Sequence, residues 1–143
     1  MTTRDRGRED IASEREIVGI KNGHKVKAPL SHAVRIGNLL YTSGVPGYFG
    51  DRQLAMNDFG SQCRQSLDNL EIILKGAGTS YDNIIKANVI LTRQSDFAEM
   101  NELYRERFSE NNYPARTTVV SELAIPGMMI EIEVVAAVPE KSS

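Results

Sequence analysis

The sequence predicts one α+β domain, in which a sheet of about six strands carries two helices packed on one of its faces. The chain has 143 residues, enough for one domain with a real core and too few for two ordinary domains. Strand-like runs lie towards both ends, and two runs with a helical apolar period lie between them. This order, without an internal repeat, is typical of a sheet covered on one face.

The first part of the chain predicts a tail followed by a hairpin. Residues 1–14 are polar and charged without a hydrophobic period, so we expect a flexible tail and assign the single domain to residues 15–140. A strand over Glu16–Ile20 and the turn signal Lys21-Asn22-Gly23 predict a hairpin that returns through Lys25–Lys27.

A second hairpin is predicted after Pro29. Its strands are Ala33–Ile36 and Leu39–Ser43, hinged on Gly37-Asn38. The segment Gly44–Asn57 is rich in glycine, proline and polar residues, so it is expected to be a loop and the first place to look for a site.

The first helix is predicted over Asp58–Ala77. Its apolar residues recur at helical spacing and form one stripe: Phe59, Cys63, Leu67, Leu70, Leu74 and Ala77. Because Cys63 falls on this stripe, we expect it in the core and not as a nucleophile.

The rest of the chain predicts a strand, a helix and two strands. The run Ile84–Leu91 is apolar enough for a central strand. A second helix begins at Ser95 or Asp96, carries apolar residues on one face and ends before Pro114. The final strands, Ala115–Ser121 and Met129–Val138, are joined by a turn at Ile125-Pro126-Gly127. The strands beginning at Ile84 and Met129 are apolar in both registers, so the uncovered face predicts self-association.

Composition excludes several functional classes. Seventeen basic and 19 acidic residues give a net charge of -2, which offers no general field for nucleic acid or anionic lipid. The single cysteine cannot form an intramolecular disulfide. The N-terminal residues contain no apolar stretch that resembles a signal sequence, and no run reaches the roughly 20 apolar residues of a membrane span. We therefore expect a cytoplasmic protein with neither a nucleic-acid nor a membrane partner.

Arg116 is the first candidate binding residue, because it begins a strand beside apolar neighbours. Its guanidinium presents a planar fork of donors that matches a carboxylate. A surface arginine in an ordinary ion pair is the alternative, and most arginines are solvated or structural.

Glu131 and Glu133 alternate with Ile130, Ile132 and Val134, so both carboxylates are predicted on one face of the sheet. A partly buried carboxylate with a raised pKa can polarise water or move a proton to a leaving amine. A strand with a polar outer face is the alternative interpretation.

Asn101 lies on the same predicted helix face as Phe97, Tyr104 and Phe108. A buried amide without partners costs on the order of 1–3 kcal/mol, so the backbone or a ligand should satisfy it.

The two histidines differ as candidate proton carriers. His24 is expected at a solvated hairpin tip, whereas His32 lies where an imidazole could exchange protons near neutral pH, although a lone histidine is more often structural. No cluster of histidine or cysteine has metal-ligand spacing, and no phosphate loop, nucleophile elbow or dinucleotide fingerprint is present. The sequence therefore predicts no metal and no cofactor.

Six segments together resemble the reactive intermediate deaminase family (Rid, or YjgF-like, of the RidA type). They are IGNLLYTSG, QSLDNLEIILKGAG, DNIIKANVILT, DFAEMNELYRERF, YPARTTV and IEIEVVA, and the similarity runs in unbroken order from Pro29 to Ala137. The resemblance implies a chorismate-mutase-like α+β subunit in a homotrimer, with clefts between neighbouring subunits.

The resemblance also implies roles for single residues. Arg116 would bind the substrate carboxylate and Glu131 would position the attacking water, while Asn101, Ser43 and Gly44 would line the cleft. The reaction would be a cofactor-free hydrolysis of enamine or imine acids such as 2-aminoacrylate or 2-iminopropionate, which releases ammonia and a 2-keto acid.

Three positions depart from the family pattern. Leu30 stands where many members have tyrosine, Val45 where they have glutamine, and Thr118 where they have cysteine or a small residue. The loss of a phenol and an amide favours a bulkier or less polar substrate. His32 is the hypothetical replacement for a proton donor.

Two other functions remain open from the sequence. A non-catalytic module that binds small carboxylates would use Arg116 in the same way. An endoribonuclease is the third hypothesis, against which the net charge of -2 and the absence of interleaved basic and aromatic residues weigh.

Overall fold

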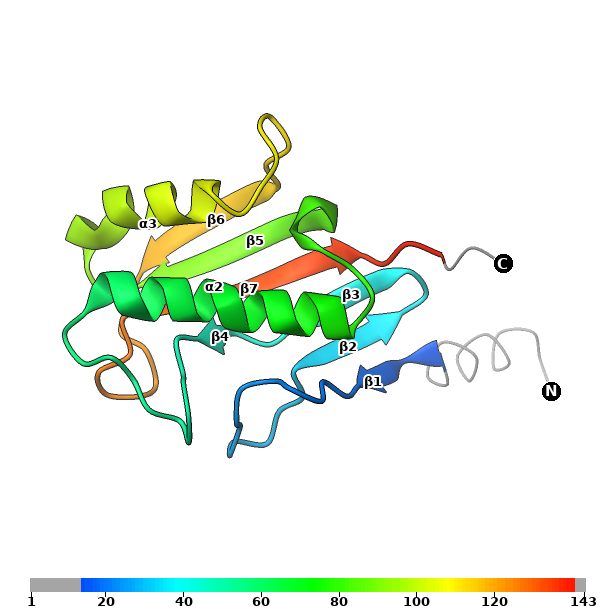
Figure 1. Cartoon of the computed structure of the whole chain (residues 1–143), viewed down its shortest axis with the longest axis horizontal. Helices are drawn as coiled ribbons and strands as arrows, with labels where there is room; N and C mark the ends of the chain where they lie inside the picture. The colour runs from blue at the N-terminus through cyan, green and yellow to red at the C-terminus, as the bar shows by residue number, and fades with distance from the viewer. Residues whose placement is uncertain (1–13, 141–143) are drawn as a thin grey trace.

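The computed structural model describes residues 14–140, and the predicted tail falls almost entirely outside them. Its elements are β1 (Glu16–Val18), β2 (Ala33–Ile36), β3 (Leu39–Thr42), β4 (Val45–Pro46), α2 (Phe59–Gly76), η1 (Tyr81–Asn83), β5 (Ile84–Leu91), η2 (Gln94–Asp96), α3 (Phe97–Arg105), β6 (Ala115–Val120) and β7 (Ile130–Ala137) (Figure 1).

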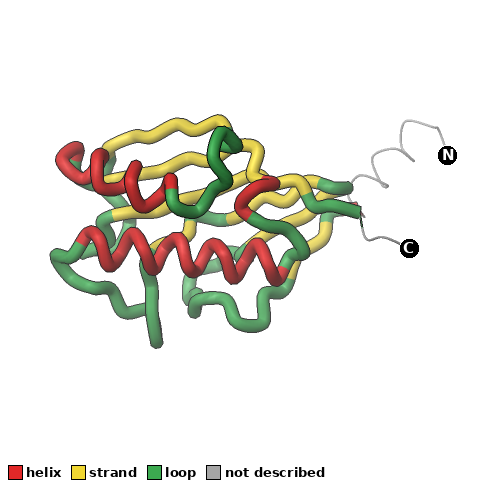
Figure 2. The backbone as a smooth tube through the Cα atoms, turned by 45° about the horizontal axis from the view of Figure 1, so that its top comes forward, coloured by secondary structure: helices red, strands yellow, loops and turns green. Residues whose placement is uncertain are grey.

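The strands form one mixed sheet in the order β1-β2-β3-β7-β5-β6, with β4 beside β7. Among the strands of residues 14–140, only β5 and β6 pair in parallel, because α3 carries the chain back between them. Both α2 and α3 lie over the same face of the sheet (Figures 1 and 2). The α+β class and the two helices on one face are therefore confirmed. The sheet has seven strands, because the two-residue β4 lies within the segment predicted as a loop.

The hairpin predicted between Glu16–Ile20 and Lys25–Lys27 is wrong. Strand β1 pairs instead with β2, in antiparallel register, and residues 25–27 belong to no strand. The β2–β3 hairpin is present, with Gly37 at a φ of +57° in its turn, so it offers β1 an edge to pair with. The segment Lys25–Lys27 has one apolar residue between two charges and gains little from burial in a sheet.

Helix α2 begins and ends close to the prediction. The side chain of Asp58 caps its first turn by accepting from the backbone N–H of Ser61 at 3.0 Å. The predicted stripe is buried apart from Ala77, which is half-buried, and burial raises the pKa of the Cys63 thiol to about 12. Cys63 therefore packs in the core as predicted.

Helix α2 also buries three polar residues, which its apolar stripe does not predict. Their side chains bind backbone groups of the following segments: Ser66 to Val45, Asn69 to Pro46 and Tyr48, and Gln62 to Ala55, Gly127 and Met129. These hydrogen bonds fix the segment after β3, and the turn before β7, against the helix.

Helix α3 is shorter than predicted and ends at Arg105. The carboxylate of Asp82 accepts from the backbone N–H of Ser109 at 3.1 Å and from its hydroxyl at 2.8 Å. These bonds hold residues 106–112 in turns, while Phe108 still packs edge-on against Tyr81.

The two faces of the sheet differ in character. Ile130, Ile132 and Val134 of β7 belong to the core beneath the helices, whereas Glu131 and Glu133 point to the open face, as predicted. The open face also exposes apolar side chains, Tyr41 and Val119 among them. Self-association through this face stays a prediction. No helix within residues 14–140 is long and apolar enough to cross a membrane.

Candidate active site in two halves

Arg116 lies at the helix-covered side of the sheet edge. It pairs in parallel register with Ala87, which is fully buried, so its side chain is directed towards α3. There, Nη2 donates to Oδ1 of Asn101 at 2.7 Å, and the guanidinium carbon lies 4.8 Å from the centroid of the Tyr104 ring and 5.8 Å from that of Phe97. Within residues 14–140, no carboxylate forms an ion pair with it.

These contacts make the surroundings of Arg116 suitable for an anion. The amide and the aromatic faces hold the guanidinium in place without neutralising its charge, so its remaining donors can meet a carboxylate. We call Arg116, Asn101 and Tyr104 the arginine half-site. An adjoining cavity of about 410 Å³ is lined by this half-site and by Arg105, Tyr113 and Pro114.

Besides the guanidinium, the arginine half-site contains a polar group that is free to bind a ligand. The hydroxyl of Tyr104 is buried and has no hydrogen-bond partner among the described residues. Burial raises the pKa of Tyr104 to about 12, although the charge of Arg116 acts in the opposite direction. The phenol is therefore a neutral donor at physiological pH. Thr118, on the same strand face, also has a buried hydroxyl without a partner, but it does not line the cavity.

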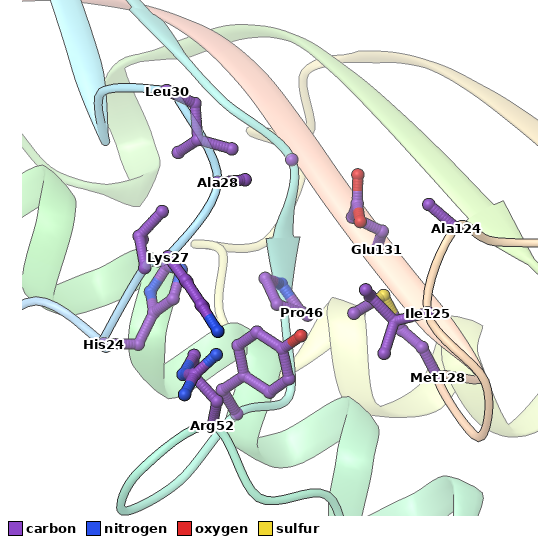
Figure 3. Close-up of a pocket in the computed structure, with 13 residues that line it drawn as sticks. His24, Lys27, Ala28, Leu30, Pro46, Arg52, Ala124, Ile125, Met128 and Glu131 are labelled. Carbon is purple, nitrogen blue, oxygen red and sulfur yellow. The ribbon is translucent and has the colours of Figure 1, made fainter.

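Glu131 lies on the opposite face, in a larger and mainly apolar cavity of about 520 Å³ (Figure 3). It pairs in register with Pro46 and Ile90, and Leu30 and Gly44 line the same cavity. We call Glu131 and Gly44 the glutamate half-site. Burial, and secondarily the negative charge of Glu133, raises the pKa of the Glu131 carboxyl. Such a carboxylate is better suited to accept and return a proton than an exposed one.

Gly44 leaves space for the side chain of Glu131. A β-carbon at this position would lie 1.9 Å from Oε1 of Glu131 and 2.8 Å from its Cγ. The backbone at Gly44 is not in the left-handed region, so space alone selects glycine here.

We therefore expect Gly44→Ala to displace the Glu131 side chain and to lower activity more than stability. Because Glu131 is half-buried and lines a cavity, its side chain can move aside at little cost in stability, but it then leaves its place at the site. The matched control is Gly19→Ala, because a β-carbon on Gly19 meets nothing within 4 Å. Thermal unfolding and catalytic activity would be measured for both. Wild-type activity in Gly44→Ala would contradict the assigned contact.

The other predicted residues lie outside the two cavities. The hydroxyl of Ser43 donates to the carbonyl of Ser31 at 2.6 Å, a contact that ties β3 to the preceding segment. The ring of His32 packs edge-on against His24, with the centroids 4.6 Å apart, and burial lowers its pKa. Neither residue lines the cavity that contains Glu131.

The expectation of a solvated His24 is wrong. His24 is half-buried between His32 and Tyr48 and lines the cavity that contains Glu131. Burial, with a smaller contribution from His32, lowers the pKa of His24 to about 4, so its imidazole is neutral at physiological pH. The error follows from the wrong hairpin, and no local sequence signal places His24 beside Tyr48.

The two half-sites cannot act on one small molecule within a single chain. Arg116 pairs with Ala87 and Glu131 pairs with Ile90 of the same strand, β5, and residues three apart along a strand point to opposite faces. The intervening sheet therefore separates the guanidinium from the carboxylate. Within residues 14–140, no three His, Cys, Asp or Glu side chains are grouped so as to hold a metal ion.

Comparisons with known proteins identify the family. The family described as Endoribonuclease L-PSP matches residues 21–138. The chain is 37% identical over 123 residues to a RutC family protein of Pyrococcus horikoshii, covering 85% of this chain and 97% of that protein. It is 32% identical over 123 residues to the 2-iminobutanoate/2-iminopropanoate deaminase of Homo sapiens, covering 85% of this chain and 89% of that protein. The crystal structure of RidA from the Antarctic bacterium Psychrobacter sp. superposes with a TM-score of 0.79 at 32% identity, covering 86% of this chain and 99% of RidA. The chain belongs to the endoribonuclease L-PSP family, which is the YjgF/Rid family.

Proposed function

We propose that this protein is a cofactor-free deaminase that hydrolyses reactive enamine and imine acids to a 2-keto acid and ammonia. The observation that carries the proposal is Arg116, a cation held by Asn101 and Tyr104 without a carboxylate partner among the described residues. An unneutralised guanidinium beside a cavity is a receptor for the carboxylate of such a substrate. The name of the human relative gives the same reaction class for that protein.

The proposed reaction needs positioning and proton transfer only. The enamine first tautomerises to an imine. Water attacks the carbon of the protonated imine, so a C–O bond forms, the π pair of the C=N bond moves to nitrogen, and the proton released by water passes to Glu131. Glu131 then returns this proton to the amine nitrogen, the C–N bond breaks and ammonia leaves. The remaining hydroxyl gives its proton to water as the carbonyl of the keto acid forms. A placed acid or base contributes typically about 10²–10⁴-fold to such a step.

The two half-sites would meet across an interface between copies of the chain. We propose a homotrimer in which the arginine half-site of one subunit faces the glutamate half-site of its neighbour, giving three clefts. The separation of Arg116 and Glu131 by the sheet supports this arrangement, since neither half alone both anchors the acid and moves the proton.

A mixed oligomer tests this arrangement directly. Arg116→Ala and Glu131→Gln chains would be co-expressed with different affinity tags and purified through both tags. Purification through both tags leaves only trimers that contain both kinds of chain, and in each of these about one site in three combines an intact Arg116 with an intact Glu131 from the neighbouring subunit. We therefore expect activity to return in the mixture, while each variant alone stays about 100-fold or more below wild type. Mixed oligomers as inactive as the single variants would contradict a shared cleft.

A direct assay separates the deaminase from a module that only binds small carboxylates. An amino-acid oxidase converts alanine to 2-iminopropionate, and semicarbazide traps the imine that remains. We expect the protein to accelerate release of the keto acid and so to reduce trapping. Binding of pyruvate in calorimetry without any such acceleration would favour the binding module, in which Arg116 anchors the ligand and no chemistry follows.

A further inference from the structure

The cavity that contains Glu131 is larger than a three-carbon or four-carbon imine acid requires. Its volume of about 520 Å³ lies within the range that holds much larger ligands. Leu30, Pro46, Ile125 and Met128 are among its apolar lining residues. In the view of Figure 3, Pro46 lies at the centre, and Ile125 and Met128 lie on the same side as Glu131.

Two cations, Lys27 and Arg52, line the same cavity. Figure 3 shows their side chains pointing towards each other, at the end away from Glu131. Within residues 14–140, Lys27 forms no ion pair, and Arg52 has one contact, from Nε to the exposed carboxylate of Asp51 at 3.4 Å. Such exposed contacts contribute little to neutralising a charge. The two positive charges therefore face the cavity without a strong partner.

The backbone holds Arg52 in an unusual conformation. Its φ is +56°, in the left-handed region that favours glycine or asparagine. The turn is closed by two backbone hydrogen bonds between Phe49 and Gln53, of 3.0 and 2.9 Å. Non-glycine residues kept in this region are concentrated at sites that hold ligands. The turn thus fixes an arginine at the cavity at some conformational cost.

We propose that Lys27 and Arg52 bind a second carboxylate of the substrate, so that the protein acts on imine or enamine dicarboxylic acids with an apolar chain between the two acid groups. This inference rests on the proposed function, because Arg116 of a neighbouring subunit takes the first carboxylate and Glu131 serves the imine carbon between them. The neutral His24 adds no charge to this end, so the attraction depends on Lys27 and Arg52 alone.

The test compares two imines with six-carbon chains that differ only at the far end. Oxidase-generated 2-iminoadipate carries the second carboxylate, and 2-iminohexanoate carries a methyl group in its place. We expect the wild-type protein to prefer 2-iminoadipate in kcat/KM by about 10- to 100-fold, the range for hydrogen bonds to charged groups. In Lys27→Gln, Arg52→Gln and the double variant, the ratio should fall towards one. Lys21→Gln, at an exposed lysine outside the cavity lining, should keep the wild-type ratio.

Binding of the keto-acid products provides a readout that does not depend on turnover. Calorimetry should show tighter binding of 2-oxoadipate than of 2-oxohexanoate, and the difference should be lost in the double variant. Equal binding of both acids, or a preference that survives in the double variant, would overturn the role of Lys27 and Arg52 even if imines are hydrolysed. Selective binding without hydrolysis of any imine would support the two cations and overturn the deaminase instead.

Discussion

Replacement of Arg116 by alanine is expected to lower kcat/KM for 2-iminopropionate by about 100-fold or more, the range for truncating one partner of a buried charge pair. The guanidinium is held by Asn101 at 2.7 Å and by the Tyr104 ring, so its position is fixed before the substrate arrives. The variant loses both the charge and the planar fork that match a carboxylate. Steady-state kinetics with semicarbazide trapping would measure the loss.

Two further variants show whether the effect belongs to carboxylate binding. Arg116→Lys keeps the charge without the fork, so we expect activity between that of wild type and Arg116→Ala. Arg64→Ala removes an exposed arginine of α2 and should leave kcat/KM unchanged. Because the Tyr104 ring packs against Arg116, thermal unfolding of each variant would show whether the fold is retained. A folded Arg116→Ala with wild-type turnover would refute Arg116 as the anchor.

The arginine half-site could be predicted in part from the sequence. The helical period placed Asn101 with the aromatic residues of its helix, and the strand pattern placed Arg116 at the start of β6. Their contact depends on the parallel crossover from β5 through α3 to β6, which no local pattern encodes. The partner that Asn101 required is therefore the side chain of Arg116 and not the backbone.

For the glutamate half-site, the sequence predicts the direction of Glu131 but not the cavity around it. Alternation correctly placed Glu131 on the face away from the core, because the period of a strand is two residues. The cavity around Glu131 is built from segments far apart in the sequence, including residues 25–27, for which the sequence predicts the returning strand of a hairpin. His24, Lys27 and Arg52 face that cavity only once the loops are folded. Turn signals in the sequence predict where the chain reverses direction, but they do not predict which side chains then line the cavity.

Glu131→Gln is the second variant with a large expected effect. The amide keeps the shape of the side chain above Gly44 but cannot accept a proton from water, so kcat should fall by about 10²–10⁴-fold. Glu133→Gln is the matched control. Glu133 lies two residues away on the same face, is exposed, and accepts from Nδ2 of Asn88 at 3.1 Å. Wild-type kcat in a folded Glu131→Gln protein would remove Glu131 from the mechanism.

The pH dependence follows from the raised pKa of Glu131. Its causes are burial and the charge of Glu133. A base must be ionised to act, so activity should fall on acidification at a pH above the range in which an ordinary glutamate titrates. We call this fall the acidic limb of the pH profile. It should be absent from the residual activity of Glu131→Gln. In Glu133→Gln the limb should move to lower pH, because one negative neighbour is gone. A limb in the same place in all three proteins would assign it to another group.

The same pKa shift predicts that Glu131→Gln gains stability while it loses activity. A carboxyl whose pKa is raised by folding binds its proton more tightly in the folded state than in the unfolded state. The stabilisation of the folded state by this proton is therefore fully present below the pKa of the unfolded state, and it is lost as the pH rises through the pKa of the folded state. At neutral pH the wild-type protein keeps a poorly solvated carboxylate, and the neutral glutamine removes that cost. We expect the free energy of unfolding of Glu131→Gln to equal or exceed that of wild type at neutral pH, with the difference disappearing on acidification. A variant that is less active and more stable would show that the half-buried carboxylate serves the reaction, whereas one that is less active and less stable would show that Glu131 supports the fold.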